Sequence, residues 1–231
     1  MPGVQYYTGQ LFDIEKITEE CHRHKIIVGF DLAHAIGNVQ LNLSKWGVDF
    51  ATWCSYKYLN SGPGGISGIY VNNKFHSDFS FPRYQGWWGN KIETRFQMNE
   101  NIDPSISSEA WVMSNPPILM LASHLASLNV FNKIGFPKIL EKGKLLTQYL
   151  GESLESLSSY GSIFKIITPS NRGSQLSLFF QMNGKKIFNE LMDRGFIVDY
   201  REPNVVRVTP VPLYNSYHEV WEFAEKLKSL V

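Results

Sequence analysis

The sequence predicts an α/β protein with a mostly parallel sheet flanked by helices, followed by a small α+β unit. The runs "KIIVGFDL", "VDFATWCS" and "GISGIYV" (25–32, 48–55 and 65–71) are almost continuously apolar, which is typical of parallel strands buried on both faces. Helical patterns alternate with the strands, as a layered α/β fold requires. The hydrophobic fraction of 43% and the charged fraction of 19% are ordinary for a globular protein.

The elements before residue 82 can be assigned in order. Residues 4–8 are rich in aromatic and β-branched side chains, which predicts an opening strand. Phe12, Ile14, Ile17 and Cys21 then recur at near-helical spacing, which predicts a surface helix. The three apolar strands follow. After Pro82 the pattern becomes irregular and aromatic.

The second half of the chain predicts two long helices, and the residues after the second complete a small α+β unit. We predict helices from Pro116 and from about Pro137 to Leu157, because apolar residues recur there at helical spacing. The remainder predicts strands at 164–169, 174–182, 196–200 and 205–210 and helices at 185–195 and 217–231. We therefore divide the chain into a first domain at 1–136 and a small C-terminal α+β domain at 137–231.

Composition excludes several classes of function. The formal net charge of +1 gives no electrostatic basis for binding nucleic acid or a membrane surface. No apolar run approaches the ~20 residues of a membrane span, and the first residues do not resemble a secretion signal. Cys21 and Cys54 make no disulfide framework, so we expect a reducing compartment, the cytosol. Cys21, His22 and His24 are too close in sequence to share a helix face, so we expect no metal site.

Lys57 is the first candidate for chemistry. It follows the strand at 48–55, at the sheet edge where open α/β sheets bind ligands. Tyr56 and Tyr58 flank it, and partial desolvation of this kind makes an amine nucleophilic. The glycines at 62, 64 and 65 allow the backbone to approach a ligand closely. Most lysines are simply solvated, but these features together predict an amine that reacts with an aldehyde cofactor.

Asp31 and His34 complete the predicted set. Asp31 ends the strand "VGFD", where a carboxylate is either structural or functional. Beside a lysine that holds pyridoxal phosphate, an aspartate keeps the pyridine nitrogen protonated so that the ring accepts electrons. His34 can return to the same site if the chain turns after Leu32. Arg207 stands among strand-like valines, where it needs an anionic partner.

Six segments carry a family resemblance. Taken together, they resemble kynureninase, a pyridoxal-phosphate enzyme of fold type I; they are "YTGQ", "VGFDLAHAIGNV", "WGVDFATWCSYKYLNSGPGG", "GWWG", "SNPPIL" and "RVTPVPLYNS". They run in order along nearly the whole chain. Related cysteine desulfurases and class V aminotransferases usually carry glutamine near the position of His34 and Ser-His-Lys at the lysine. This chain has histidine and Ser55-Tyr56-Lys57 there, which favours kynureninase.

The resemblance implies a fold and a role for each candidate. The fold would be that of the pyridoxal-phosphate-dependent transferases, with part of the large domain and the small domain present. Lys57 would bind the cofactor aldehyde covalently. Asp31 would pair with the pyridine nitrogen and His34 would help to hold the cofactor. Tyr56 would contact the phosphate and assist proton transfer.

The resemblance implies that the remaining candidates lie where the substrate binds. Trp87 and Asn115 match family residues near the cofactor that reach in from the other subunit of a homodimer, and Asn115 would also contact the substrate. Arg207 would clamp the α-carboxylate of an amino-acid substrate. Trp111-Val112 replaces the Phe-Arg of animal-type members, which affects the fit of the substrate.

The implied reaction is a hydrolysis at the Cβ–Cγ bond of L-kynurenine or 3-hydroxykynurenine. Its products are L-alanine and anthranilate or 3-hydroxyanthranilate, a step of tryptophan catabolism and NAD biosynthesis. Family members are considerably longer than this chain. One alternative is therefore an inactive shortened product that associates with full-length subunits. Another is a relative of the cysteine desulfurases or class V aminotransferases.

Overall fold

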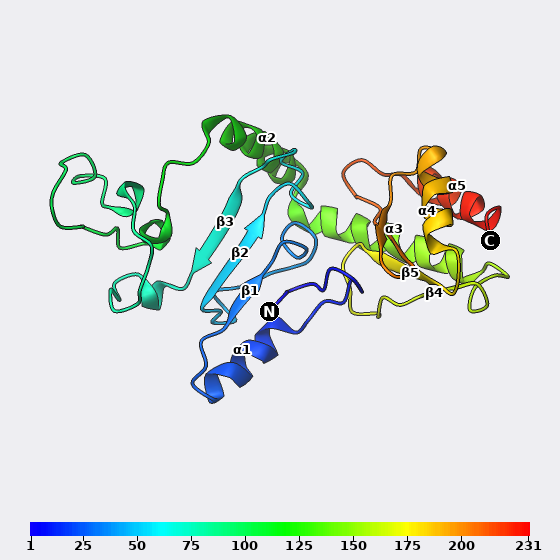
Figure 1. The fold of residues 1–231 in the computed structure, drawn as a ribbon, viewed down its shortest axis with the longest axis horizontal. Coiled ribbons are helices and arrows are strands. Elements are labelled where there is room, and N and C mark those ends of the chain that lie inside the picture. The colour runs from blue at the N-terminus through cyan, green and yellow to red at the C-terminus, as the bar shows by residue number, and fades with distance from the viewer. The chain divides into compact units, whose positions relative to one another are not determined.

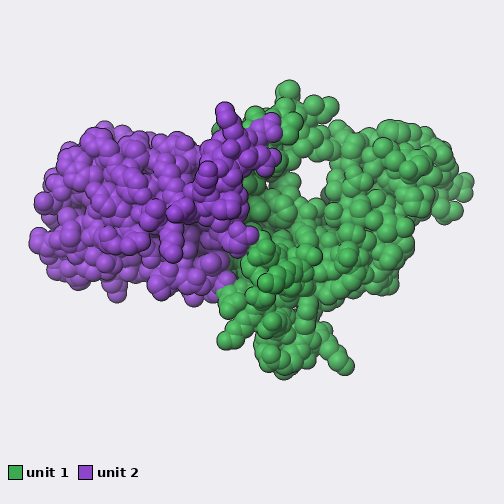
Figure 2. All heavy atoms as spheres, turned by 180° about the vertical axis from the view of Figure 1, so that it is seen from behind, with its two compact units in different colours: residues 1–3, 13–36, 41–128 green, residues 4–12, 37–40, 129–231 purple.

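A computed structural model describes residues 1–231, and the chain forms two compact units (Figure 1, Figure 2). Unit 1 comprises residues 1–3, 13–36 and 41–128, and unit 2 comprises residues 4–12, 37–40 and 129–231. Unit 2 thus contains the predicted C-terminal domain and two short segments from the N-terminal part of the chain. Each unit has its own sheet.

Unit 1 opens with helix α1 (Ile14–Arg23), where the apolar spacing predicted a surface helix. Asp13 caps the helix, since its Oδ1 accepts the N–H of Lys16 at 3.0 Å. Ile14 is buried, and the acidic and basic residues of α1 lie on its exposed face. The helix is therefore held by one apolar stripe and a local cap.

The sheet of unit 1 has the order β1-β2-β3, with β1 (Gly29–Asp31), β2 (Phe50–Cys54) and β3 (Ser67–Val71). The predicted parallel pairing holds for β1 and β2, and an isolated parallel bridge joins Pro2 to Asp31. β3 pairs with β2 antiparallel, because the chain returns through a loop rather than through the crossover helix that parallel strands need.

β1 is shorter than the apolar run at 25–32 that predicted it. The backbone N–H groups of Lys25 and Ile26 bond back to the last turn of α1, at 2.9 Å each. The N–H of Val28 donates to the carboxylate of Asp49 at 2.7 Å. Because these donors are already used, the ladder with β2 begins only at Gly29.

The rest of unit 1 is irregular and aromatic, as predicted. Its short 3-10 helices are η1 (Asn73–Phe75), η2 (Trp87–Gly89) and η3 (Ser108–Trp111), and α2 (Ile118–Ile134) follows. Most large apolar residues of α2 are exposed; Phe131, in the part assigned to unit 2, is the one that is buried. None of the helices combines the length and the hydropathy that a membrane crossing requires.

Unit 2 is an antiparallel sheet covered by helices. Its strands have the order β4-β5-β7-β6, and α3 packs against α5 (Figure 1). The elements in chain order are α3 (Phe136–Glu155), β4 (Phe164–Ile166), β5 (Leu176–Phe180), α4 (Gly184–Asp193), β6 (Asp199–Arg201), β7 (Val205–Val208) and α5 (Tyr217–Lys228). Their core is one continuous apolar cluster that includes Leu146, Leu154, Phe164, Leu178, Phe180, Val206 and Leu227.

The opening strand predicted at residues 4–8 is wrong. Val4 makes only an isolated bridge with Leu11, and residues 6–8 form a turn. The side chain of Gln5 causes this, because its Oε1 accepts the backbone N–H of Tyr7 at 2.5 Å and of Thr8 at 2.9 Å. A side chain that takes backbone donors in this way competes with a strand ladder.

Candidate functional site

The carboxyl ends of β1 and β2 define the candidate site. The strands are parallel, and Asp31 at the end of β1 is paired in register with Thr52 of β2. The chain therefore leaves both strands at the same edge of the sheet. Lys57 lies in the loop that follows Cys54, the last residue of β2. Edges of this kind are where open α/β sheets place their ligands.

Lys57 and His34 meet at this edge. The chain turns after Leu32, whose carbonyl accepts the N–H of Ala35 at 2.9 Å. This turn brings His34 back, so that its Nε2 lies 3.1 Å from the Nζ of Lys57. The ring of His34 also contacts Tyr58 edge to face, with centroids 6.2 Å apart. Both side chains of the lysine–histidine pair are half-buried.

Asp31 is held by its backbone and exposes its carboxylate. Its N–H donates to the carbonyl of Met1 and its carbonyl accepts the N–H of Gly3, each at 2.8 Å. Its Oδ1 accepts the N–H of Ala33 at 2.8 Å. The side chain is exposed, in contrast to the buried carboxylate of Asp49 described below. A fixed, accessible carboxylate suits a group that must bind a ligand.

Tyr56 lies within reach of the same carboxylate. Its hydrogen bond with Cys54 raises the pKa of the phenol above 10.0, and the charge of Asp31 raises it further. The phenol is therefore neutral throughout the physiological range and can donate a hydrogen bond. Tyr56 is 49% exposed, so a ligand can reach it.

Trp87 and Asn115 come from neighbouring segments of unit 1. The N–H of Trp88 donates to the carbonyl of Met113 at 3.4 Å. Gly86 makes this approach possible, because a Cβ there would lie 2.0 Å from the carbonyl oxygen of Met113. Trp87 is 42% exposed, and Asn115 is exposed as well. The glycines of "GWWG" therefore serve a close backbone crossing.

Arg207 lies on β7 of unit 2, where Asp199 supplies the anionic partner that its sequence context required. Its Nε and Nη2 both lie 2.6 Å from Asp199 Oδ2. Its Nη1 donates to the carbonyl of Tyr6 at 2.7 Å. Three of the five guanidinium N–H groups are thus used, which leaves one on Nη1 and one on Nη2.

Asp49 is a buried polar residue that sequence reasoning missed. Its Oδ2 lies 2.9 Å from His22 Nε2 and its Oδ1 lies 2.5 Å from Lys74 Nζ, and it also accepts the N–H of Val28. Burial raises the pKa of this carboxyl, but the hydrogen bonds from Lys74, Val28 and His22 outweigh burial and lower the pKa below 3.8. The cluster joins α1 and η1 to the residues that directly precede β1 and β2, and it is structural.

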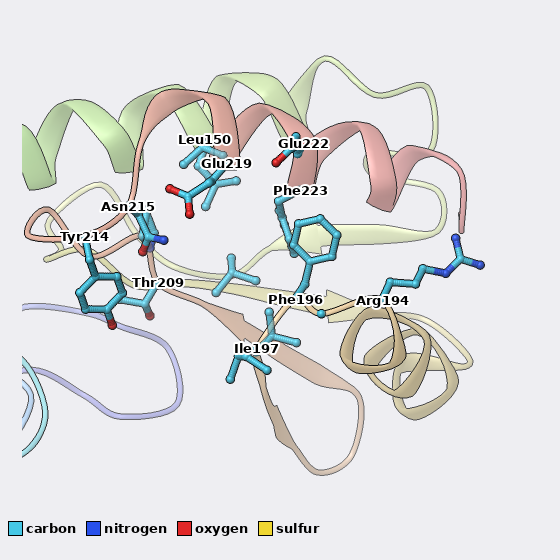
Figure 3. Close-up of a pocket in the computed structure, with 15 residues that line it drawn as sticks. Leu150, Arg194, Phe196, Ile197, Thr209, Tyr214, Asn215, Glu219, Glu222 and Phe223 are labelled. Atoms are coloured by element: carbon cyan, nitrogen blue, oxygen red, sulfur yellow. The ribbon is translucent and has the colours of Figure 1, made fainter. Parts of the chain in front are cut away.

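Unit 2 also contains an open cavity of about 520 Å³, shown in Figure 3. Phe196, Val208 and Phe223 are among its apolar lining residues. Glu219 is one of its several polar lining residues and is already used, because it completes the capping box of α5 with Ser216. None of the predicted site residues lines this cavity. We therefore assign the candidate site to the sheet edge of unit 1.

Comparison with known proteins also indicates kynureninase. A family model described as the kynureninase C-terminal domain matches residues 139–227. The kynureninase of Christiangramia forsetii is 49% identical over 230 residues, which cover 98% of this chain and 54% of that protein. The kynureninase of Mus musculus is 46% identical over 238 residues, covering 99% of this chain and 51% of that protein.

Solved structures agree on the fold. A mutant of C-DES, with glycine linked covalently to its pyridoxal-phosphate cofactor, matches 98% of this chain and 59% of its own, with a TM-score of 0.84 and 17% identity. At that identity the likeness shows the fold alone, which is the predicted pyridoxal-phosphate-dependent transferase fold. The sequence relatives, at 46% and 49% identity, identify the family as well as the fold. The chain belongs to the kynureninase family and spans about half the length of the curated relatives it matches.

Proposed function

We propose that this chain provides the lysine-bearing part of a kynureninase site. The complete site would hydrolyse L-kynurenine or 3-hydroxykynurenine to L-alanine and an anthranilate. The observation that carries the proposal is the amine of Lys57 at 3.1 Å from His34, at the sheet edge where Asp31 ends β1, in a chain 49% identical to a kynureninase. Such an enzyme would act in tryptophan catabolism and NAD biosynthesis. Both cysteines are free, which is compatible with the reducing cytosol.

The residues present fit pyridoxal phosphate. A half-buried amine, an exposed carboxylate and a neutral phenol lie at one edge of one sheet. They come from Lys57, Asp31 and Tyr56. Bound pyridoxal phosphate supplies an electron sink for the bond cleavage. The donor set therefore has the chemistry that the cofactor requires.

Each side chain would have a distinct task. Lys57 would bind the aldehyde carbon and later exchange a proton with the substrate. Asp31 would keep a ring nitrogen protonated, since an ionised carboxylate stabilises the charge on that nitrogen. Tyr56 would donate a hydrogen bond from its hydroxyl group to the phosphate, because its raised pKa keeps the phenol protonated. His34 would hold Lys57 in place between these steps.

Arg207, Trp87 and Asn115 would complete the substrate side. Asp199 fixes the guanidinium plane, and the remaining N–H groups on Nη1 and Nη2 can bind both oxygens of a carboxylate. Trp87 and Asn115 would contribute from the second subunit of a homodimer. Their exposure in unit 1 supports a role at a subunit boundary.

Replacing Arg207 with alanine should raise the kynurenine concentration needed for half-saturation by at least roughly 100-fold, since two hydrogen bonds to a charged group together contribute at least about 3 kcal/mol. The measurement is a kynurenine titration of the cofactor absorbance. The spectrum before substrate addition should be unchanged. If Arg207→Ala erased the cofactor signal itself, the carboxylate-clamp assignment would be wrong.

The test of the proposed function combines cofactor trapping with turnover. The purified chain is titrated with pyridoxal phosphate, reduced with borohydride and mapped by peptide mass, and anthranilate release from kynurenine is followed by fluorescence. We expect saturable labelling at Lys57 and turnover far below that of a full-length kynureninase. Labelling scattered over surface lysines, or none, would overturn the proposal. Full-length turnover would overturn the half-site interpretation.

A second candidate function is association with full-length subunits without catalysis by this chain. Large apolar side chains are exposed between residues 84 and 119, which favours an interface. The most exposed of them are Tyr84 (88%), Met98 (92%), Ile118 (76%) and Leu119 (80%). Co-purification with a full-length kynureninase subunit would support this function. A clean monomer in sizing experiments would count against it.

A further inference from the structure

The loop that carries Lys57 is closed at its base by two buried serines. Ser55 and Ser61 are each 1% exposed. The N–H of Ser55 donates to the carbonyl of Ile66 at 3.1 Å, and the N–H of Ser61 donates to the carbonyl of Ser55 at 3.2 Å. Lys57 lies between the two serines in sequence. Its backbone is therefore part of a closed ring.

The serine hydroxyls form a directed chain inside this ring. The Oγ of Ser61 donates to the Oγ of Ser55 at 2.6 Å, and the Oγ of Ser55 donates to the carbonyl of Ile66 at 2.5 Å. Each hydroxyl proton is thus used, and Ser55 both donates and accepts. Satisfied networks of this kind rigidify the backbone that they join. We call Ser55 and Ser61 the serine pair.

Gly65 leaves the space that the serine pair needs. A Cβ at residue 65 would lie 2.4 Å from the Oγ of Ser61, and 3.0 Å from both the Oγ of Ser55 and the carbonyl oxygen of Gly62. No side chain fits there unless the hydroxyls move. The glycine is therefore required by close packing, beyond any approach to a ligand.

Helix α2 holds the loop from outside through two more hydroxyls. The Oγ of Ser123 donates to the carbonyl of Ser61 at 2.7 Å. The Oγ of Ser127, one turn further along α2, donates to the carbonyl of Leu59. Serines four residues apart lie on one face of a helix, so α2 presents this face to the loop. The loop is thus fixed at its base and along its side.

We propose that the serine pair, with the space left by Gly65, is the positioning device that holds Lys57 against His34. The inference rests on the proposed function for its purpose, because a fixed amine is what a covalent cofactor site requires. Its geometry does not depend on that function. The hydroxyls of the serine pair bond to each other and to the carbonyl of Ile66 and not to the amine, so the pair acts through the backbone of Lys57.

The experiment measures how fast acetic anhydride acetylates individual lysines of the full chain. Lys57 is half-buried beside His34, so limited access of the reagent should keep its rate below that of exposed Lys45, although a partly desolvated amine is intrinsically more nucleophilic. Ser61→Ala removes one hydrogen bond of about 0.5–1.5 kcal/mol, which should raise the Lys57 rate about 2- to 10-fold towards that of Lys45. Lys74, ion-paired with Asp49 in the same unit, should keep its rate.

The second variant tests the packing. Gly65→Ala should raise the Lys57 rate more than Ser61→Ala does, since overpacking a close-packed site costs more than the loss of one hydrogen bond. Ser61→Ala added to Gly65→Ala should partly restore the slow rate, because it removes the Oγ that lies 2.4 Å from the new Cβ. Ser153→Ala is the matched control, since Ser153 donates to the carbonyl of Tyr149 in unit 2.

The outcomes separate the inference from the proposed function. A faster rate at Lys57 alone, with partial restoration in the double variant, supports positioning. Equal increases at Lys57 and Lys74 would mean that unit 1 has loosened generally, and unchanged rates or additive effects would mean that the serine pair is irrelevant to Lys57; each overturns the inference. Failure of pyridoxal phosphate to label Lys57 in the unmodified chain would overturn the proposed function only.

Discussion

Lys57→Ala is expected to abolish the attachment of pyridoxal phosphate to this chain. The amine of Lys57 is fixed at 3.1 Å from His34 at the edge of the sheet where a ligand can bind. Reaction with an aldehyde needs a free amine held in one orientation, and alanine supplies none. The measurement is the saturable absorbance of the bound cofactor, followed by borohydride reduction. Both signals should fall to the background given by surface lysines.

Two matched variants make the result interpretable. Lys57→Arg keeps the positive charge but cannot form the covalent bond, so it should fail as Lys57→Ala does. Lys45→Ala removes an exposed lysine of the same unit and should leave both signals unchanged. If Lys57→Ala still bound the cofactor saturably, the reactive amine would lie elsewhere. The proposed function would then lose its central residue.

Asp49→Ala is expected to lower the free energy of unfolding of unit 1 by about 2–4 kcal/mol, because it leaves the hydrogen-bond donors around a buried carboxylate without their acceptor. The carboxylate is fully buried, and it accepts hydrogen bonds from the side chains of His22 and Lys74 and from the N–H of Val28. Urea unfolding followed by tryptophan fluorescence reports on this unit, since Trp221 is the only tryptophan outside it.

The contribution of Asp49 should depend on pH with a definite sign. The folded state holds the pKa of this carboxyl below 3.8, so protonation favours the unfolded chain. The stabilisation is therefore fully present above about pH 4 and is lost as the pH falls through the lowered pKa. The difference in stability between the unmodified chain and Asp49→Ala should be constant at neutral pH and shrink in acid.

Asp103 provides the control for this prediction. It lies in the same unit, pairs with Lys91 at 2.6 Å and also has a lowered pKa, but its side chain is 37% exposed. Solvent screens such a pair, so Asp103→Ala should change the stability much less. A loss at Asp103 equal to that at Asp49 would mean that burial is not what gives the Asp49 cluster its strength.

Much of the fold could be predicted because local patterns and tertiary packing agree. Apolar spacing located α1, α3 and α5, and side-chain caps at Asp13 and Ser216 fix where two of them begin. The failures lie where one side chain redirects the backbone. Gln5 turned a predicted strand into a turn, and Asp49 took the N–H of Val28 that the ladder would have used. Strand propensity does not register such competition.

The residues of the candidate site likewise differ in how far the sequence predicts their arrangement. The proximity of Lys57 to His34 could be predicted because the carboxyl ends of parallel strands must meet at one edge. Ser55 and Ser61 could not, since serine is mostly exposed and only the folded loop buries both hydroxyls. Arg207 was expected to need an anion, and Asp199 now supplies one from the adjacent strand. The sequence alone does not distinguish a protein carboxylate from a substrate carboxylate.

The N-terminal segment of unit 2, residues 4–12, bonds to residues that are translated much later than itself. Tyr7 accepts the hydroxyl of Ser177 and Leu11 donates to the carbonyl of Asn171, so partners about 160–170 positions apart complete one unit. At about 5–20 residues per second, the segment waits roughly 8–30 s after its own translation before these partners exist. Unit 2 therefore closes only after residues 171–177 have been translated. A pause in translation before residue 171 would leave the segment unprotected, within reach of proteases and chaperones.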